Sequence, residues 1–411
     1  MSRTNCILHL NYCQNCPNLK NEANKLANRL INSLYLRQLL KLIASMKYNW
    51  QLPDWTKFIF DDSVIDSLCM NFALETGELK GLVDSLSTEI QQETILQFMI
   101  SEAIKTSEIE GEFFSRQDVM SSVKKNLGIG GFGQIRDKNA QGIGQLMVTV
   151  RNSYSVKLTE FTIKQWHAIL MEYSKRVNPG EYRTGKEPMQ IVSGTFGKEI
   201  IHFEAPPSNQ VPAEMTKFVK WYNDFKIKPT DIKKALIKTS ISHLYFESIH
   251  PFEDGNGRIG RAIAEKCLSE SLNRPVLMSI SSTIEQNKKQ YYESLKQAQR
   301  TLEITDWILY FSTLILESQK SAKLTVLFTL NKTKFIDKYN DQMNERQRKA
   351  VLKMFENGVS GFEGGMTAIK YVSINKTSRA TATRDLQDLT EKNILTPRGE
   401  GRNRCYDLNL V

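Results

Sequence analysis

The sequence predicts a mainly α-helical protein that carries one β-hairpin and ends in a small domain of helices and two short strands. Apolar residues recur at helical spacing over residues 62–86, 89–110 and 231–249. Residues 189–192 and 199–203 flank a Gly-containing turn, the pattern of a hairpin. Because a lone hairpin is too small to form a sheet core, helices must supply the core, and the hairpin edges stay free to pair with another chain.

The composition is that of a protein with more than one hydrophobic core. The chain has 411 residues, of which 40% are hydrophobic and 24% charged. These values exclude disorder of the whole chain and allow two or three cores of ordinary size. The longest apolar-rich stretch, residues 26–46, is interrupted by polar and basic side chains and falls short of the roughly 20 apolar residues that a spanning helix needs. We therefore expect no membrane partner.

Cysteine usage and the N-terminus indicate a reducing compartment. Six cysteines in so long a chain are too few for a disulfide framework. The first residues lack the basic, apolar and small-residue order of a signal peptide, because Arg3 is soon followed by a polar run at residues 11–24. The cytoplasm is the predicted location.

Residues 1–47 form an N-terminal extension whose role stays open. Its first 45 residues hold six Lys and Arg against one Glu, a net charge of +5 out of +10 for the chain. Leu26, Leu30 and Leu34 recur at helical spacing. A helix packed on the protein's own body is the favoured interpretation. A basic helix that binds a partner or a membrane surface and a start of translation at Met46 are the alternatives.

The segment 250–261 carries the clearest functional signal. Pro251 must end the preceding helix, because proline disfavours α geometry in the residue before it, so His250 lies at the end of a rigid element. A turn rich in glycine then leads into a second helix. The start of a helix presents unpaired backbone N–H groups and a partial positive charge, so this turn is predicted to bind an anion.

Charged side chains in the same segment suit a polyphosphate. Arg258 and Arg261 lie three residues apart on one helix face and could clamp phosphate oxygens. Asp254 is a hard carboxylate of the kind that holds Mg²⁺ while a nucleotide supplies further ligands. His250 is the nearby group that can accept a proton at neutral pH. Each residue has an ordinary structural explanation by itself, but the whole set favours a functional site.

These twelve residues, HPFEDGNGRIGR, fit the signature H-P-F-x-[D/E]-G-N-G-R-x-x-R without a mismatch, and the sequence therefore resembles the Fic family over about residues 48–325. The resemblance implies a Fic helical bundle with a β-hairpin flap. It also implies transfer of AMP from ATP to a Ser, Thr or Tyr hydroxyl of a protein, which can be the enzyme itself. His250 would be the general base and Asp254 the Mg²⁺ ligand. The implied nucleotide-binding residues of the signature are Gly255, Asn256, Gly257, Arg258, Ile259, Gly260 and Arg261.

Two further parts of the chain share the resemblance. The hairpin is similar to the family's flap, whose edge pairs with an extended target segment, and Ile191 and Val192 are the expected strand contacts. Tyr291 and Gln299 resemble residues on the adenine side of the site, although some members have Asn at the position of Gln299. Amphipathic core packing is the alternative for Tyr291.

Residues 106–111, TSEIEG, resemble the [S/T]-x-x-x-E-[G/N] inhibitory helix of Fic proteins whose brake precedes the catalytic core. In those proteins the Glu, here Glu110, pairs with the second Arg of the signature, here Arg261, and blocks the γ-phosphate pocket. A surface helix with Gly111 as an ordinary residue after its end is the alternative. Glu110 could also position a water that removes AMP, so deAMPylation remains open.

Residues 340–411 resemble a winged helix-turn-helix domain. The residues expected at the head of its recognition helix and in its wing are Ser378, Arg379, Thr381, Thr383, Arg384, Arg398, Arg402 and Arg404. DNA, a docked protein and a second copy of the chain, as in a homodimer, remain open as partners. Winged helices serve each purpose, and residues 341–411 carry a net charge of only +3.

Four regions are therefore predicted: an extension at 1–47, a helical region with the inhibitory helix at 48–130, a Fic catalytic core at 131–325 and a winged helix at 340–411. The predicted function is a self-inhibited protein adenylyltransferase that uses ATP and Mg²⁺. The alternative is a DNA-binding regulator whose Fic core senses ATP. Transfer of UMP or of phosphate also remains open.

Overall fold

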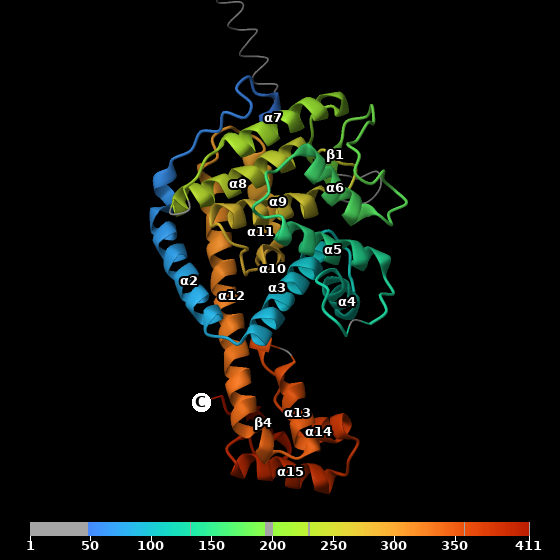
Figure 1. Ribbon diagram of the computed structural model, residues 1–411, viewed down its shortest axis with the longest axis vertical. Helices are drawn as coiled ribbons and strands as arrows, with labels where there is room; N and C mark the ends of the chain where they lie inside the picture. Colours follow the sequence, from blue (N-terminus) through green and yellow to red (C-terminus); the bar gives the residue numbers. More distant parts are fainter. Residues whose placement is uncertain (1–47, 132, 194–199, 229–230, 357, 411) are drawn as a thin grey trace, which may run out of the picture.

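The structure, a computed structural model, describes residues 48–410 apart from 132, 194–199, 229–230 and 357. The expectations for residues 1–47 and for the turn of the hairpin lie outside this part of the chain. A helical body stands above a smaller C-terminal domain, and one long helix runs from the first into the second (Figure 1). The mainly helical fold expected from the sequence is confirmed.

The body contains the helices and strands from α2 to α11 together with most of α12. Their bounds are α2 (Asp66–Asp84), α3 (Thr88–Ile109), α4 (Arg116–Asn126), α5 (Lys138–Asn152), α6 (Glu160–Met171), β1 (Gln190–Ser193), β2 (Ile200–Glu204), α7 (Val211–Asp224), α8 (Ile232–Ile249), α9 (Asn256–Ser271), α10 (Ile280–Gln286), α11 (Lys288–Ala298) and α12 (Thr305–Tyr339). The C-terminal domain contains α13 (Glu345–Phe355), α14 (Ala368–Asn375), α15 (Arg379–Glu391), β3 (Leu395–Arg398) and β4 (Cys405–Leu408).

Helix α8 is the centre of the body. Every residue from Ala235 to Ile249 is buried, and the helix contributes to two hydrophobic clusters, one with α5, α6 and α7 and the other with α2, α11 and α12. The buried hydroxyls of Thr239, Ser240 and Ser242 donate to carbonyls one turn earlier in the same helix, so these three donors are satisfied. A helix enclosed on all sides places the residue at its end in a fixed position.

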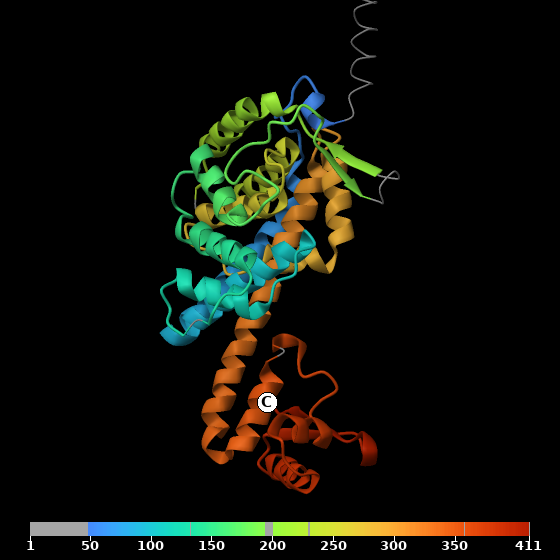
Figure 2. The ribbon, with the colours of Figure 1, turned by 90° about the vertical axis from the view of Figure 1, so that its right-hand side faces the viewer.

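The hairpin pairs β1 with β2 in antiparallel fashion, with Gln190 opposite Glu204, close to the predicted bounds. The pairing is irregular between Ile191 and Val192, the two residues expected to contact a target. Phe203 anchors the hairpin from β2, since it is buried and its ring lies edge-on against Tyr48. In Figure 2 the hairpin projects from the side of the helical body.

Helix α12 has 35 residues and spans about 52 Å at 1.5 Å per residue. Trp307 and Phe311 pack in the body near its start, whereas Phe335 and Tyr339 belong to the core of the C-terminal domain near its end. The sequence predicts separate domains that end at residue 325 and begin at residue 340. Helix α12 runs continuously through this interval, and apolar residues of its two halves belong to two different cores.

The C-terminal domain shows the order of elements that the sequence predicted. α14 and α15 are joined by a short turn with Lys376 in the left-handed region, and Ser378 caps α15 by accepting a hydrogen bond from Thr381 N. Strands β3 and β4 pair in antiparallel fashion. Asp385 is buried at the centre, where the side chains of Arg346 and Tyr371 donate to it.

None of the helices in the described part of the chain is long and apolar enough to cross a bilayer.

Close packing of α5 against α6 depends on a glycine and gives the first prediction. A β-carbon at Gly142 would lie 2.7 Å from the carbonyl oxygen of Ile169, whereas one at Gly77, on α2, would meet nothing within 4 Å. We expect Gly142→Ala to lower the free energy of unfolding by about 1–3 kcal/mol through overpacking. Gly77→Ala should raise it by up to about 1 kcal/mol through helix propensity. Urea unfolding followed by circular dichroism measures both, and equal midpoints would contradict the assigned packing.

Candidate active site

His250 ends α8 in a defined but uncommon conformation. Its backbone is left-handed, with φ 49° and ψ 62°, and its N–H donates to the carbonyl of Phe246 at 2.9 Å. A non-glycine residue adopts this region at a cost of roughly 1–2 kcal/mol, so the surroundings must hold it there. Only 13% of its side chain is exposed. The sequence predicted the end of the helix at this residue, and the structure confirms it.

The turn after His250 is braced from both sides. Asn256 accepts a hydrogen bond from Phe252 N at 2.9 Å and donates to Phe252 O at 2.8 Å, which closes the turn. The ring of His167, on α6, stacks on Phe252 with 3.8 Å between centroids, and its Nε2 lies 3.1 Å from the carbonyl oxygen of Asp254. Gly255 has φ 81° and directly precedes α9. The amide of Asn256 therefore shapes the turn.

The two signature arginines extend from α9 and are buried, with 3% exposure for Arg258 and 2% for Arg261. Arg261 donates through Nη2 to Glu110 Oε1 at 2.7 Å and to the carbonyl of Thr106 at 2.9 Å, and through Nε to Thr106 Oγ1 at 2.7 Å. Arg258 donates to Glu112 Oε2 at 2.5 Å, while its Nε is buried without a partner in the described part of the chain. Both arginines thus already bind carboxylates from the end of α3 and the residues after it.

The carboxylate of Glu110 occupies the start of α9. A β-carbon built on Gly257 would overlap Glu110 Oε1, so the oxygen lies against the first turn of the helix, where an anion is favoured. Burial by itself raises the pKa of Glu110, but Arg261, with smaller contributions from Arg258 and Lys288, lowers it below the usual value. Lys288 also donates to the carbonyl of Ile109 and so binds the end of α3. Glu110 is therefore charged at neutral pH.

The imidazole of His250 is neutral at physiological pH. Burial lowers its pKa, the positive charge of Arg183 lowers it further, and the result is about 4. Glu247, one turn earlier on α8, has Oε2 3.7 Å from His250 Nδ1, and burial raises the pKa of this carboxyl to about 8. A neutral, buried imidazole beside an anion site can accept a proton from a hydroxyl.

Asp254 and the arginines fit a magnesium nucleotide. The side chain of Asp254 is 50% exposed and lies 3.6 Å from Arg258, so its outer oxygen can reach solvent. One carboxylate leaves most of the coordination shell of Mg²⁺ to water and phosphate, which is how Mg²⁺ usually binds. The unpartnered Nε of Arg258 is a donor that a phosphate oxygen would satisfy.

The two residues expected on the adenine side, Tyr291 and Gln299, are both buried. Tyr291 is 1% exposed and its hydroxyl lies 2.7 Å from His243 Nε2, while Gln299 is 2% exposed and donates to the carbonyl of Glu247 at 3.2 Å. Both side chains therefore bond within the protein and support α8. The neighbouring Tyr292 is 38% exposed and lies beside Lys288. In the hairpin, Val192 is 48% exposed, whereas Ile191 is partly buried against a small cluster.

Glu112 and Arg183 are part of the site but carry no motif of their own in the sequence. Glu112 directly follows the motif at residues 106–111, and its place two residues after Glu110 is the available signal. Arg183 lies in the loop between α6 and β1, 67 residues before His250, and donates to the His250 carbonyl at 2.8 Å. Nothing in the local sequence around Arg183 indicates this contact, since it depends on how distant segments meet.

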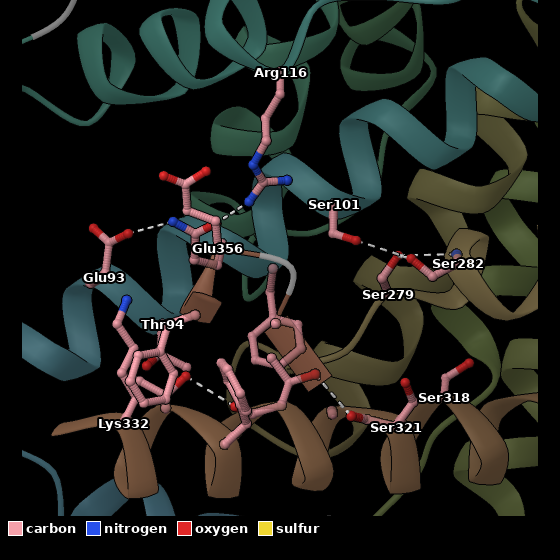
Figure 3. Close-up of a pocket in the computed structure, with 18 residues that line it drawn as sticks. Glu93, Thr94, Ser101, Arg116, Ser279, Ser282, Ser318, Ser321, Lys332 and Glu356 are labelled. Carbon is pink, nitrogen blue, oxygen red and sulfur yellow. Dashed lines mark hydrogen bonds between the residues drawn. The ribbon is translucent and has the colours of Figure 1, made fainter. Parts of the chain in front are cut away.

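A separate cleft of about 410 Å³ lies between α3, α12 and the end of α13 (Figure 3). Its walls carry many hydroxyl groups, several of which bond within the protein, as when Ser318 donates to Thr283 and Thr325 donates to the carbonyl of Ser321. Arg116 donates to Gln97 at its rim. None of the signature residues lines it, so this cleft is distinct from the site at His250.

Comparison with known proteins places the signature in a recognised family. Residues 157–268 match the Fic/DOC family, and residues 48–129 match a domain of unknown function, DUF4172. A probable protein adenylyltransferase of Aquifex aeolicus is 33% identical over 97 residues, 24% of this chain and 27% of the relative. Protein adenylyltransferase Fic of Nematostella vectensis is 23% identical over 194 residues, 46% of this chain and 41% of the relative.

The chain thus spans less than half the length of either relative. A solved structure of a Fic family protein from Desulfovibrio desulfuricans aligns with 82% of this chain and 95% of its own, at 16% identity and a TM-score of 0.46. The intact signature at residues 250–261 lies within the segment 157–268 that matches the Fic/DOC family.

Proposed function

We propose that the protein is a protein adenylyltransferase of the cytoplasm, which transfers AMP from ATP to a hydroxyl of a protein substrate. The observation that carries the proposal is the neutral imidazole of His250 beside a helix N-terminus with two buried arginines. The names of the two curated relatives support the same activity. Phosphate-centred transfer depends mainly on positioning and charge neutralisation, which these residues supply.

His250 is the general base of the proposed reaction. The substrate hydroxyl oxygen forms a bond to the α-phosphorus of ATP, its proton goes to the imidazole, and the bond from that phosphorus to the pyrophosphate oxygen breaks. The backbone N–H groups in the first turn of α9, that of Gly257 among them, would face the developing charge, whereas the N–H of Gly255 donates to Asp254 Oδ1. Arg258 and Arg261 hold the β- and γ-phosphates. Asp254 would hold Mg²⁺, whose charge would help to neutralise the phosphates.

The hairpin is the proposed binding place of the substrate chain. Val192 is exposed on β1, and β1 pairs on one side with β2, which leaves its other edge available for an added strand. Main-chain hydrogen bonds to such an edge hold an extended segment without requiring a particular sequence. The substrate is therefore expected to present its hydroxyl from an extended segment.

Glu110 is the proposed brake. It accepts from Nη2 of Arg261 and covers the first turn of α9, so it would compete directly with a phosphate group. Glu112 takes a donor of Arg258 in the same way. The alternative role of Glu110, positioning a water for deAMPylation, uses the same carboxylate in the same place.

The brake gives the second prediction. Glu110→Gly removes the competing carboxylate and should raise incorporation of label from α-³²P-ATP about tenfold or more. A tenfold rise requires the activation free energy to fall by only about 1.4 kcal/mol. Glu108→Gly is the matched control, because Glu108 lies on the same helical turn but pairs with Lys105. It should leave labelling at the level of the unmodified protein.

Adding His250→Ala to Glu110→Gly should abolish the labelling. Retained labelling in this double variant would remove His250 from the mechanism, and equal labelling of all single variants would remove the brake. Parallel reactions with labelled UTP and GTP identify the donor. If the wild-type protein removes label from a substrate that already carries AMP and the Glu110→Gly variant does not, deAMPylation is favoured.

The protonation state of His250 gives the third prediction. Since its pKa is about 4, the imidazole resonances should not move between about pH 7.5 and about pH 5.5, whereas an ordinary histidine titrates near 6.5. Histidine-selective NMR measures this, with His250→Ala to assign the signal. A midpoint near 6.5 would show an exposed imidazole and contradict the buried site.

A DNA-binding role for the C-terminal domain is the second candidate. Arg379 and Arg384 are exposed near the start of α15, the position of a recognition helix, and Arg404 is exposed in the following hairpin. A regulator that senses ATP through its Fic core would use these residues and would not need His250. A protein surface or a second copy of the chain could occupy the same face.

The fourth prediction tests this candidate. Arg379→Ala together with Arg384→Ala should lower affinity for duplex DNA about tenfold or more and should reduce the salt dependence of binding. Lys320→Ala, on α12 outside the C-terminal domain, is the control for general loss of positive charge. Fluorescence anisotropy at several salt concentrations measures both effects. Equal affinity of the three proteins would exclude α15 as the contact.

A further inference from the structure

Arg183 is a buried charge that belongs to no helix, strand or signature. It lies in the loop between α6 and β1, and 3% of its surface is exposed. Burial lowers its pKa from the usual value of arginine to about 10, so the group remains charged at neutral pH. A buried charge is costly unless several partners satisfy it. Its partners therefore show what the residue does.

One side of the guanidinium binds the end of α8. Nε donates to the carbonyl of His250 at 2.8 Å, and Nη2 reaches the carbonyl of Ile249 at 3.3 Å. The backbone N–H of Arg183 donates to the carbonyl of Pro251 at 3.0 Å. Arg183 thus contacts the carbonyls of three consecutive residues centred on His250. The last carbonyls of a helix have no partner within the helix, and a cation is favoured at this end.

The other side of the guanidinium binds the segment that leaves the hairpin. Nη2 donates to the carbonyl of Pro206 at 2.5 Å, and Nη1 donates to Ser208 Oγ at 2.9 Å. Strand β2 ends at Glu204, two residues earlier. A single planar group therefore connects the end of the hairpin with His250. Lysine could not replace it, because one ammonium cannot match the fixed fork of five N–H donors.

These contacts act on the backbone conformation that orients the imidazole. His250 is left-handed, and a residue in that region relaxes unless its carbonyl and its neighbours are held. Phe246 holds the N–H of His250, whereas Arg183 holds its C=O. The segment connected through Pro206 carries the strand on which a substrate chain would be added. The positions of the base and of the hydroxyl it must reach therefore depend on the same side chain.

We propose that Arg183 is a positioning residue, which fixes the imidazole of His250 relative to the hairpin and thereby sets the distance between base and substrate hydroxyl. The proposal rests on the proposed function of His250 as general base. A misplacement of about 1 Å at a reacting group can cost about 100-fold in rate. Nucleotide binding, in contrast, depends on α9 and its arginines, which Arg183 does not contact in the described part of the chain.

The test uses the full chain with Glu110→Gly as the active background. Arg183→Lys keeps the charge but not the fork, and Arg183→Gln removes both. We expect both to lower kcat for AMP transfer by about 100-fold and to leave the Kd for Mg-ATP, measured by calorimetry, within about twofold. Arg151→Gln is the control, because Arg151 is partly buried and, like Arg183, donates to a carbonyl, that of Val276, away from His250. It should leave kcat unchanged.

An NMR measurement separates this proposal from the proposed function, because it needs no activity. With Arg183→Gln the His250 pKa should rise toward the ordinary value of about 6.5, since a nearby positive charge is lost, and with Arg183→Lys it should stay low while kcat still falls. Unchanged kcat with Arg183→Lys would overturn positioning by the fork. Equal losses of kcat and of ATP affinity, or equal losses with Arg151→Gln, would reduce Arg183 to a structural role. Absence of labelling in the background protein itself would instead reject the proposed function.

Discussion

The ion pair between Arg261 and Glu110 is the interaction on which the arrangement of the site depends. It joins the end of α3 to the start of α9, two elements 151 residues apart in the sequence, with 2.7 Å between Nη2 and Oε1. The Arg261 side chain is buried whereas that of Glu110 is partly exposed, and a buried arginine is tolerated only when its remaining donors are satisfied. Thr106 supplies two acceptors for Arg261, and Lys288 binds the carbonyl of Ile109. The partner of Arg261 can therefore change only if another anion takes the same place, and a phosphate group has the required charge.

The rest of the fold positions this interaction by enclosing α8. Hydrophobic clusters on both sides of that helix leave it no freedom to shift, so His250 at its end keeps a fixed distance from α9. The turn between the two helices is held by Asn256 from within and by the ring of His167 from α6. Gly255 in turn lies so close to α6 that a β-carbon there would come within 3.0 Å of Met171. The turn that carries the signature is thus built between rigid elements.

The sequence predicted the elements that local patterns determine and missed those that depend on tertiary contacts. Pro251 and the glycines around it place the end of α8 and the start of α9 without any knowledge of the fold. The contact between Glu110 and Arg261 was expected from family resemblance, and the structure contains it. Arg183 could not be found in this way, because its partners at Ile249 and Pro206 are backbone carbonyls, which leave no mark in the sequence. The roles expected for Tyr291 and Gln299 stay predictions, since the structure shows both bonded to groups within the protein.

The position of Glu110 at the end of α3 explains how a pair this well satisfied could still be exchanged for a nucleotide. A carboxylate at a helix C-terminus is opposed by the macrodipole by about 0.3–1 kcal/mol, whereas at the start of α9 the same charge is favoured by a similar amount. Glu110 experiences both, because it ends one helix and lies against the first turn of another. A phosphate bound at the start of α9 would be stabilised by the α9 macrodipole without being destabilised by that of α3. It would also satisfy the free Nε of Arg258, which Glu112 leaves unpartnered. In the proposed function, the carboxylates would compete with a nucleotide because covalent tethering nearby gives them a high effective concentration.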